Sequence, residues 1–203
     1  MNANPAPIPA EKAALRREMV ARRDAIPESE RERIAAALVE RIVSLPRYAQ
    51  ARTVLCTMAI GSEWNTRLLV DRARADGKAI VLPRITPPPR HLEIHVVRDF
   101  EHDLVAGVWN IPEPDPARCP AVSIAEVDLA VVPALAVDFD GYRLGYGAGY
   151  FDRLLTPRPA STYCLTALPS AFVVERLPHE GHDQVLDLIV DEVGTRRTRG
   201  AKS

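Results

Sequence analysis

The sequence predicts an α/β protein built around a layered sheet. Short apolar runs rich in β-branched residues alternate along the chain with segments of helical composition. Runs such as 53–59 and 128–132 are apolar on both faces, as in buried parallel strands. The alternation and the apolar runs together favour helices packed against a mainly parallel sheet.

Two helices are predicted ahead of the first strand. Residues 11–24 carry a loose apolar stripe, and residues 29–43 form the second helix, which Pro46 ends. Thr66 is predicted to cap a third helix, which Gly77 closes. A short helix is predicted over 149–155, and strands are predicted over 53–59, 79–82, 91–97, 128–132, 162–167 and 186–190.

The length of 203 residues suits a single domain large enough to bury a core. We expect that domain to span residues 11–193, after a flexible lead-in at 1–10 and before a basic, flexible tail at 194–203. A hydrophobic content of 47% with 26% charged residues is typical of a soluble globular protein.

Charge and patterning argue against nucleic acid and membranes as partners. The net charge of −1 supplies no general attraction to either. No apolar run reaches the roughly 18 residues that a membrane span needs, and residues 1–10 lack the basic and apolar regions of a secretory signal. The three cysteines are far apart and form no metal-binding pair. We therefore expect a cytoplasmic protein with reduced thiols.

Residues 141–153, GYRLGYGAGYFDR, are the most informative segment of the chain. Its alternating glycines let the backbone approach a ligand closely, and a glycine-rich loop leading into a helix offers free N–H groups to a phosphate. Arg143 can grip phosphate oxygens, and Asp152 can hold Mg²⁺. The spacing fits neither the P-loop nor the dinucleotide-binding pattern. A tight turn with packed aromatic side chains is the alternative to an anion site.

Glu63 and Trp64 follow the strand at 53–59, at the strand end where ligands bind in layered α/β sheets. The indole of Trp64 can present a flat apolar face to an aromatic ligand. A solvated turn is the alternative for this segment.

Lys12 and Arg16 lie on the same face of the first helix. Arg22 or Arg23 extends this basic surface about two turns later. The surface can clamp a triphosphate if the helix folds over the glycine loop, and a solvated helix face is the alternative.

Residues 178–183, PHEGHD, combine two histidines with two carboxylates. His179 and His182 have no third nitrogen or sulfur ligand nearby. Asp183, sharing a hard cation with Asp152, is therefore the better candidate, and Mg²⁺ is the cation it suits. The alternative is a polar loop.

Taken together, these segments resemble the 5-formyltetrahydrofolate cyclo-ligase family, also called 5,10-methenyltetrahydrofolate synthetases. The resemblance spans about residues 12–192, and the glycine segment is its most specific part. The matching motifs are, in order, Lys12-x-x-Leu15-Arg16, Glu63-x-x-Thr66, Ile111-x-Glu113-Pro114, Asp128-Leu-x-x-Val132-Pro133, Arg143-Leu-Gly-Tyr-Gly-x-Gly-Tyr-x-Asp152 and Pro178-x-Glu180-x-His182-Asp183.

The resemblance implies a three-layer α/β/α sandwich with a mostly parallel sheet, similar to the sugar-phosphate isomerase and CoA-transferase group. It also implies an ATP- and Mg²⁺-dependent enzyme that closes 5-formyltetrahydrofolate to 5,10-methenyltetrahydrofolate. In such an enzyme ATP phosphorylates the formyl oxygen, N10 attacks the activated carbon, and phosphate leaves. We expect a monomer whose partners are these small molecules.

Residue roles follow from the resemblance by position. Arg143 and Tyr150 are expected to act in catalysis, and Asp152 and Asp183 are expected to hold Mg²⁺. The expected ATP-binding residues are Lys12, Arg16, Arg143, Gly145, Tyr146, Gly147, Ala148, Gly149, Tyr150, Phe151 and Asp152. The expected folate-binding residues are Met58, Glu63, Tyr146, Gly147, Ala148, Gly149 and Tyr150, with Glu63 hydrogen-bonded to the pterin.

Four positions depart from the family pattern. Ala148 replaces a glycine, Phe151 replaces a tyrosine, Met58 stands where an aromatic residue or leucine is common, and Asp191 stands where threonine is frequent. Alanine costs little if its φ is negative. None of these changes removes a charge from the expected site, so we expect an active enzyme. The alternatives are a catalytically weak folate- or nucleotide-binding paralogue and, more distantly, an RNA-associated phosphate-binding module.

Overall fold

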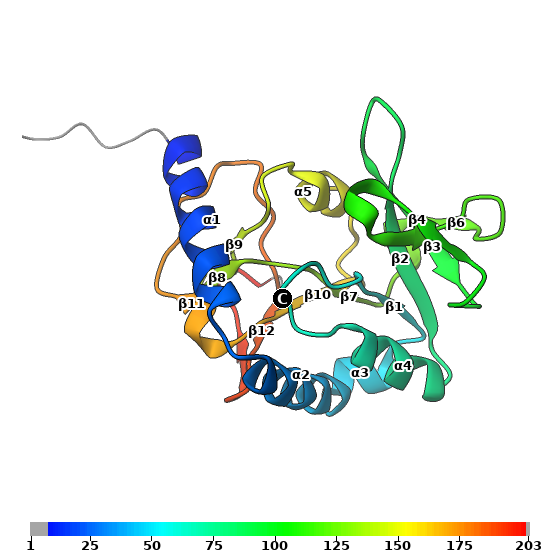
Figure 1. Ribbon diagram of the computed structural model, residues 1–203, viewed down its shortest axis with the longest axis horizontal. Helices are drawn as coiled ribbons and strands as arrows, with labels where there is room; N and C mark the ends of the chain where they lie inside the picture. The colour runs from blue at the N-terminus through cyan, green and yellow to red at the C-terminus, as the bar shows by residue number, and fades with distance from the viewer. Residues whose placement is uncertain (1–7, 202–203) are drawn as a thin grey trace, which may run out of the picture.

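The computed structural model describes residues 8–201 and centres on an eight-stranded sheet (Figure 1). Its strands are β1 (Thr53–Leu55), β2 (Ala79–Ile85), β3 (Leu92–Val97), β6 (Ala121–Val122), β7 (Leu129–Val131), β10 (Tyr163–Ala167), β12 (Leu188–Val190) and β13 (Thr195–Arg197). They lie in the order β13-β12-β10-β7-β1-β2-β3-β6. The neighbours from β12 to β2 run parallel, whereas β13, β3 and β6 pair antiparallel. The predicted mostly parallel sheet is confirmed.

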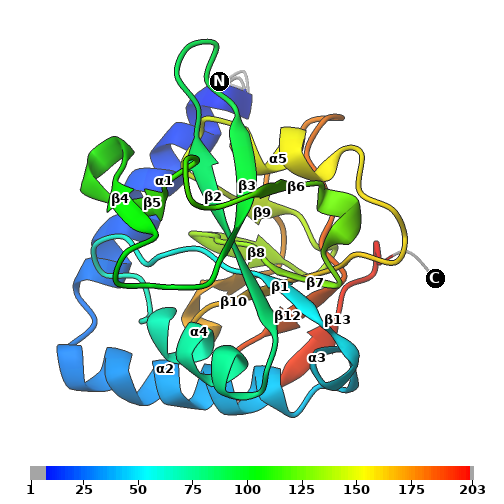
Figure 2. The ribbon, with the colours of Figure 1, turned by 90° about the vertical axis from the view of Figure 1, so that its right-hand side faces the viewer.

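Both faces of this sheet are covered. Helices α2 (Glu28–Val43), α3 (Pro46–Gln50) and α4 (Arg67–Ala75) lie along one face, and α5 (Tyr150–Leu155) lies on the other side (Figure 2). Because successive strand residues point to opposite faces, Val54 packs with the α2 and α4 side chains while Leu55 packs with Leu155 of α5. All three side chains are fully buried. This double coverage explains why the central strands are apolar throughout.

Helix α1 (Ile8–Asp24) packs beside a second, three-stranded sheet of β8 (Ala136–Asp138), β9 (Arg143–Leu144) and β11 (Val173–Val174). Met19 of α1 is buried with Leu144 and Phe172. The buried carboxylate of Asp138 accepts hydrogen bonds from the backbone amides of Asp140, Tyr142 and Leu177, which fixes the turn between β8 and β9. This small sheet positions the segment that follows β9. A separate hairpin, β4 (Leu104–Ala106) with β5 (Pro112–Pro114), lies beside β2.

Two predictions about the chain ends need correction. The first helix begins at Ile8, so the end of the predicted lead-in is helical, and residues 1–7 lie outside the described part of the chain. The predicted flexible tail is wrong over 195–197, because these residues pair with β12 as an edge strand. Thr198 is buried and donates its hydroxyl hydrogen to Leu186 O at 2.5 Å. An edge strand can keep its side chains in solvent, which is why this polar segment does not look like a strand.

Smaller corrections concern single elements. Thr66 makes no side-chain capping bond, although Gly77, with φ of +76°, does close α4. Pro46 ends the second helix and also begins α3. The first strand, predicted over 53–59, covers only Thr53–Leu55.

Among the helices of residues 8–201, none is long and apolar enough to cross a membrane.

Candidate active site

The alternating glycines form a loop, residues 145–149, that connects β9 to α5 (Figure 1). Gly147 and Gly149 adopt φ values of +104° and +63°, which side chains disfavour. Ala148 between them is not among the residues with positive φ, so its methyl group brings no backbone strain. The loop therefore has glycine where its backbone requires it and tolerates alanine where it does not.

Arg143 and Asp152 lie at the two ends of this glycine loop and form an ion pair. Arg143 Nη2 donates to Asp152 Oδ1 at 2.9 Å, and Nη1 donates to Gln184 O at 3.1 Å. The amide of Gln184 donates to the same Asp152 oxygen at 3.0 Å. Burial lowers the pKa of Arg143, while the charge of Asp152 acts in the opposite direction. The pair thus fixes both ends of the loop and joins them to the segment 178–184.

Helix α1 brings two more cations to this region. Lys12 Nζ lies 2.5 Å from Asp183 Oδ2 and 3.3 Å from Glu180 Oε2. Arg16 Nε donates to Gly145 O at 2.8 Å, and its guanidinium lies against Gly147. Although burial acts to raise it, the pKa of Asp183 is held below its usual value by hydrogen bonds from Lys12 and from the Glu180 amide. The helix thus contacts the loop through Arg16 and the segment 178–184 through Lys12, the two residues that the sequence singled out.

Glu63 lies beside the loop and is held by three groups. Its Oε2 accepts a hydrogen bond from the amide of Ile60 at 2.9 Å, and its Oε1 accepts one from the hydroxyl of Tyr146. Arg23 Nη1 lies 3.6 Å from Glu63 Oε1 and donates to the Tyr146 oxygen at 2.7 Å. Arg23 also donates to Ser62 Oγ at 2.9 Å. The network joins the end of α1, the segment after β1 and the glycine loop.

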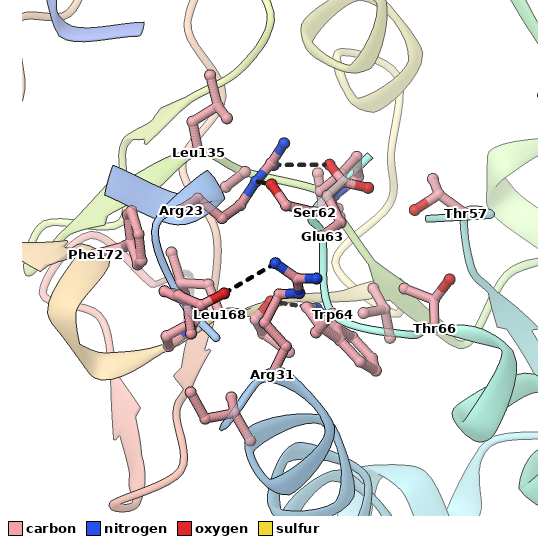
Figure 3. Close-up of a pocket in the computed structure, with 18 residues that line it drawn as sticks. Arg23, Arg31, Thr57, Ser62, Glu63, Trp64, Thr66, Leu135, Leu168 and Phe172 are labelled. Atoms are coloured by element: carbon pink, nitrogen blue, oxygen red, sulfur yellow. Dashed lines mark hydrogen bonds and ion pairs between the residues drawn. The ribbon is translucent and has the colours of Figure 1, made fainter. Parts of the chain in front are cut away.

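A narrow pocket of about 40 Å³ opens at the carboxyl ends of β1, β7 and β10. Figure 3 shows Arg23 extending toward Ser62 and Glu63 at this pocket, with Trp64 and Leu168 also lining it. Trp64 Nε1 donates to Ala167 O at 2.8 Å, which fixes the indole against the core. The position agrees with the strand-end location predicted for Glu63 and Trp64.

Other predicted site residues lie elsewhere. Met58 packs against the core and does not line the pocket. Phe151 packs against the core cluster that contains Leu155. Tyr150 lies in the first turn of α5, where it lines an open groove of about 350 Å³ along β3 and β6 together with Arg153. Met58 and Tyr150, two of the predicted folate contacts, therefore do not line the pocket beside Glu63, and the ATP-binding roles of Tyr150 and Phe151 stay predictions.

The histidines of the segment 178–183 have no metal-site geometry. The ring of His179 stacks on Tyr142 with 3.8 Å between centroids, and the side chain of His182 is 69% exposed. Asp152, by contrast, lies beside the backbone that follows Asp183, because the Gln184 amide donates to Asp152 Oδ1 at 3.0 Å. Within residues 8–201, no group of three or more His, Cys, Asp or Glu side chains could hold a metal ion by itself. Two carboxylates suit Mg²⁺ when phosphate oxygens complete its shell, so the donor set fits this ion.

The sequence left open which of Arg22 and Arg23 faces the site, and the structure decides it. Arg23 is buried in the Glu63 network, whereas Arg22 donates to Ala171 O at 2.9 Å on the outside of the helix. The contact between Tyr146 and Glu63 was also not predicted. No pattern in the sequence indicates it, since the two residues lie in segments far apart in the chain.

The fold and this site define an α/β enzyme in which a glycine loop, surrounded by paired cations, adjoins a small-molecule pocket. Comparison with known proteins makes the assignment more specific. The chain belongs to the 5-formyltetrahydrofolate cyclo-ligase family, whose model matches residues 8–192. The resemblance inferred from the motifs is thereby confirmed.

Individual relatives agree with the family. The chain is 33% identical over 177 residues to the 5-formyltetrahydrofolate cyclo-ligase of Mycolicibacterium smegmatis, covering 86% of this chain and 90% of that protein. The 5-formyltetrahydrofolate cyclo-ligase of Mus musculus is 25% identical over 189 residues, which are 89% of this chain and 93% of that one. The solved structure of the Aquifex aeolicus 5,10-methenyltetrahydrofolate synthetase is similar with a TM-score of 0.82 at 30% identity, covering 95% of both chains. The relation to sugar-phosphate isomerases and CoA-transferases stays a prediction.

Proposed function

We propose that this protein catalyses the ATP-dependent closure of 5-formyltetrahydrofolate to 5,10-methenyltetrahydrofolate, with release of ADP and phosphate. Membership of the cyclo-ligase family supports the reaction. One structural relationship carries it on this chain: Tyr146 belongs to the glycine loop and also contacts Glu63 in the adjoining pocket. A phosphate donor on the loop and a folate bound at Glu63 would have their reacting groups side by side.

The cations around the loop are the expected phosphate ligands. Lys12, Arg16 and Arg143 are now paired with Asp183, the Gly145 carbonyl and Asp152, respectively. Phosphate oxygens can replace these internal partners, because they are charged acceptors that form strong hydrogen bonds with ammonium and guanidinium groups. When bound, Mg²⁺ supplies further neutralisation of the phosphate charge, with Asp152 and Asp183 as its protein ligands.

The chemistry requires positioning more than acid or base catalysis. The formyl oxygen attacks the γ-phosphorus of ATP and the bond to ADP breaks. N10 then attacks the formyl carbon, the bond from this carbon to the phosphorylated oxygen breaks, and N10 loses its proton as phosphate leaves. Arg143 offsets charge on the transferred phosphoryl group, while Glu63 accepts hydrogen bonds from the pterin and orients it. Tyr150 stays a predicted catalytic residue.

A folate-binding paralogue without turnover is not favoured by any observation. The reason to consider such a paralogue is the presence of Ala148, Phe151 and Met58 at positions where the family commonly has other residues. Ala148 has no positive φ, and the side chains of Phe151 and Met58 pack against the core. The three departures therefore leave the charged residues around the loop unchanged.

Compartment and assembly belong to the same proposal. We place the enzyme in the cytoplasm as a monomer. The three cysteines, Cys56, Cys119 and Cys164, are all buried and free, which suits a reducing compartment.

A near-ultraviolet absorbance assay for methenyltetrahydrofolate tests the proposal. We expect product only when the protein, 5-formyltetrahydrofolate, ATP and Mg²⁺ are all present. Absence of product from a folded protein that still binds folate or ATP would reduce the function to binding.

A further inference from the structure

Tyr146 lies over Glu63 at the outside of the pocket. Its hydroxyl donates to Glu63 Oε1 and accepts a hydrogen bond from Arg23 Nη1 at 2.7 Å. The side chains of Arg23 and Glu63 are only 11% and 9% exposed, whereas Tyr146 is 44% exposed. Tyr146 is therefore the outermost member of the three.

Both oxygens of Glu63 already have partners. Oε2 accepts a hydrogen bond from the Ile60 amide at 2.9 Å. Oε1 accepts a hydrogen bond from the Tyr146 hydroxyl, and Arg23 Nη1 lies 3.6 Å from the same oxygen. The Glu63 side chain is only 9% exposed, and the phenol of Tyr146 occupies a position beside Oε1 from which a ligand N–H would donate. The ligand and Tyr146 therefore compete for one oxygen.

We propose that Tyr146 is a latch, which 5-formyltetrahydrofolate must displace from Glu63 in order to bind, while Arg23 remains paired with Glu63 and positions its carboxylate. The inference rests on the proposed function, since the pterin ring supplies the competing N–H donors. Loss of the Tyr146 hydroxyl should therefore strengthen folate binding, whereas loss of a residue that only contacts the substrate would weaken it.

The surroundings of Tyr146 allow this movement. Gly145 and Gly147 flank it, and Gly147 has a φ of +104° that is open to glycine. The exposed ring loses little packing when it swings outward. Burial and the Glu63 charge raise the pKa of Tyr146, so the hydroxyl keeps its proton at neutral pH and remains a donor. The main cost of opening is two hydrogen bonds, one from the hydroxyl to the Glu63 carboxylate and one from the Arg23 guanidinium to the hydroxyl.

The latch also links the two halves of the site. Tyr146 is part of the loop that Arg16 contacts at Gly145 O, at 2.8 Å. Release of Tyr146 by folate therefore moves the same backbone that is expected to hold the phosphates.

Tyr146→Phe tests the latch, because it removes the hydroxyl and keeps the ring. Titration calorimetry with 5-formyltetrahydrofolate in the absence of ATP should give a Kd about three- to tenfold lower than that of the wild type, since no bond to a charged group has to break. Stopped-flow binding should show a faster association. Tyr146→Leu, which also lacks the hydroxyl, should change Kd in the same direction. Tyr142→Phe is the matched control, because its ring stacks on His179, and its Kd should stay at the wild-type value.

The outcomes separate the latch from the proposed function. A Kd that is unchanged or higher in both Tyr146 variants, with the wild type binding folate, overturns the latch and leaves the proposed function in place. A folded wild type that binds no folate overturns both.

Discussion

Lys12 and Asp183 form an ion pair, with 2.5 Å between Nζ and Oδ2, that joins the first helix to a segment near the other end of the chain. The pair holds α1 beside the glycine loop, where Arg16 contacts Gly145. Lys12 is also a proposed contact of the ATP phosphates, and Asp183 is a proposed ligand of Mg²⁺. Binding of ATP and Mg²⁺ should therefore replace the ion pair between these two residues by their contacts with the phosphates and the metal ion.

Lys12→Met is predicted to weaken ATP binding. Loss of a charge-assisted hydrogen bond to phosphate should raise the KM for ATP about ten- to hundredfold, with little change in folate affinity. Lys78→Met is the control, because Lys78 donates to Ala51 O and lies over the ring of Tyr48. Equal KM values for ATP in the Lys12 variant and the wild type would exclude Lys12 from the phosphate site.

Arg22 and Arg23 provide a matched pair of substitutions. Arg23→Gln should raise the KM for 5-formyltetrahydrofolate by about tenfold or more, because Glu63 loses a cation in a buried position. Arg22→Gln should change it by less than about twofold, since its side chain is 45% exposed and donates to Ala171 O rather than contacting Glu63. Steady-state kinetics on both variants would contradict this account if the two KM values moved together.

Asp152→Asn should affect both stability and the metal requirement. Arg143, whose side chain is 4% exposed, would lose its charged partner, and the free energy of unfolding should fall by about 1–3 kcal/mol. The Mg²⁺ concentration needed for half-maximal activity should rise. Urea unfolding and a Mg²⁺ titration measure the two effects. Asp140→Asn removes only an exposed pair with Arg199 and should change stability by less than about 0.5 kcal/mol.

Glycine is predicted to be required at position 107, because the side chain of Glu113 leaves no room for a Cβ there. Glu113 is 4% exposed, and a Cβ added at Gly107 would lie 2.2 Å from its carboxyl carbon. Burial raises the pKa of Glu113, while hydrogen bonds from the Ile85 and Val108 amides act to lower it, so its side chain cannot move freely. Gly107→Ala should cost about 1–3 kcal/mol, and less when combined with Glu113→Ala.

Gly181→Ala is the control for this substitution, because nothing lies within 4 Å of its added Cβ. Chemical denaturation of the two single variants and the double variant gives the coupling. Additive effects of Gly107→Ala and Glu113→Ala would show that the two residues do not interfere.

The sequence predicted the central fold because that part depends on burial. Strands β1, β7 and β10 are apolar on both faces, and the pattern of residues alone reveals them. The edge strand β13, Thr195–Arg197, could not be found in this way, since all three residues are exposed and polar. The two-residue strand β9 is too short to carry a periodicity.

The sequence predicted individual residues of the candidate site but not the contacts between them. The motifs predicted Lys12, Arg16, Arg143 and Asp152 as ATP-binding residues. In the structure Arg16 contacts the glycine loop, Arg143 and Asp152 flank it, and Lys12 pairs with Asp183. The phase of α1, which buries Arg23 rather than Arg22, depends on packing of Met19 against the second sheet. Such tertiary contacts decide which of two adjacent residues faces a site, and they cannot be predicted from the local sequence.

The most direct test of the central claim, that the glycine loop and the Glu63 pocket act as one site, is a paired measurement on the wild-type protein. Phosphate release and methenyltetrahydrofolate formation are followed together after 5-formyltetrahydrofolate, ATP and Mg²⁺ are mixed. We expect the two products to appear in equal amounts and neither to form when folate is left out. Phosphate release without ring closure, or at the same rate without folate, would contradict the claim.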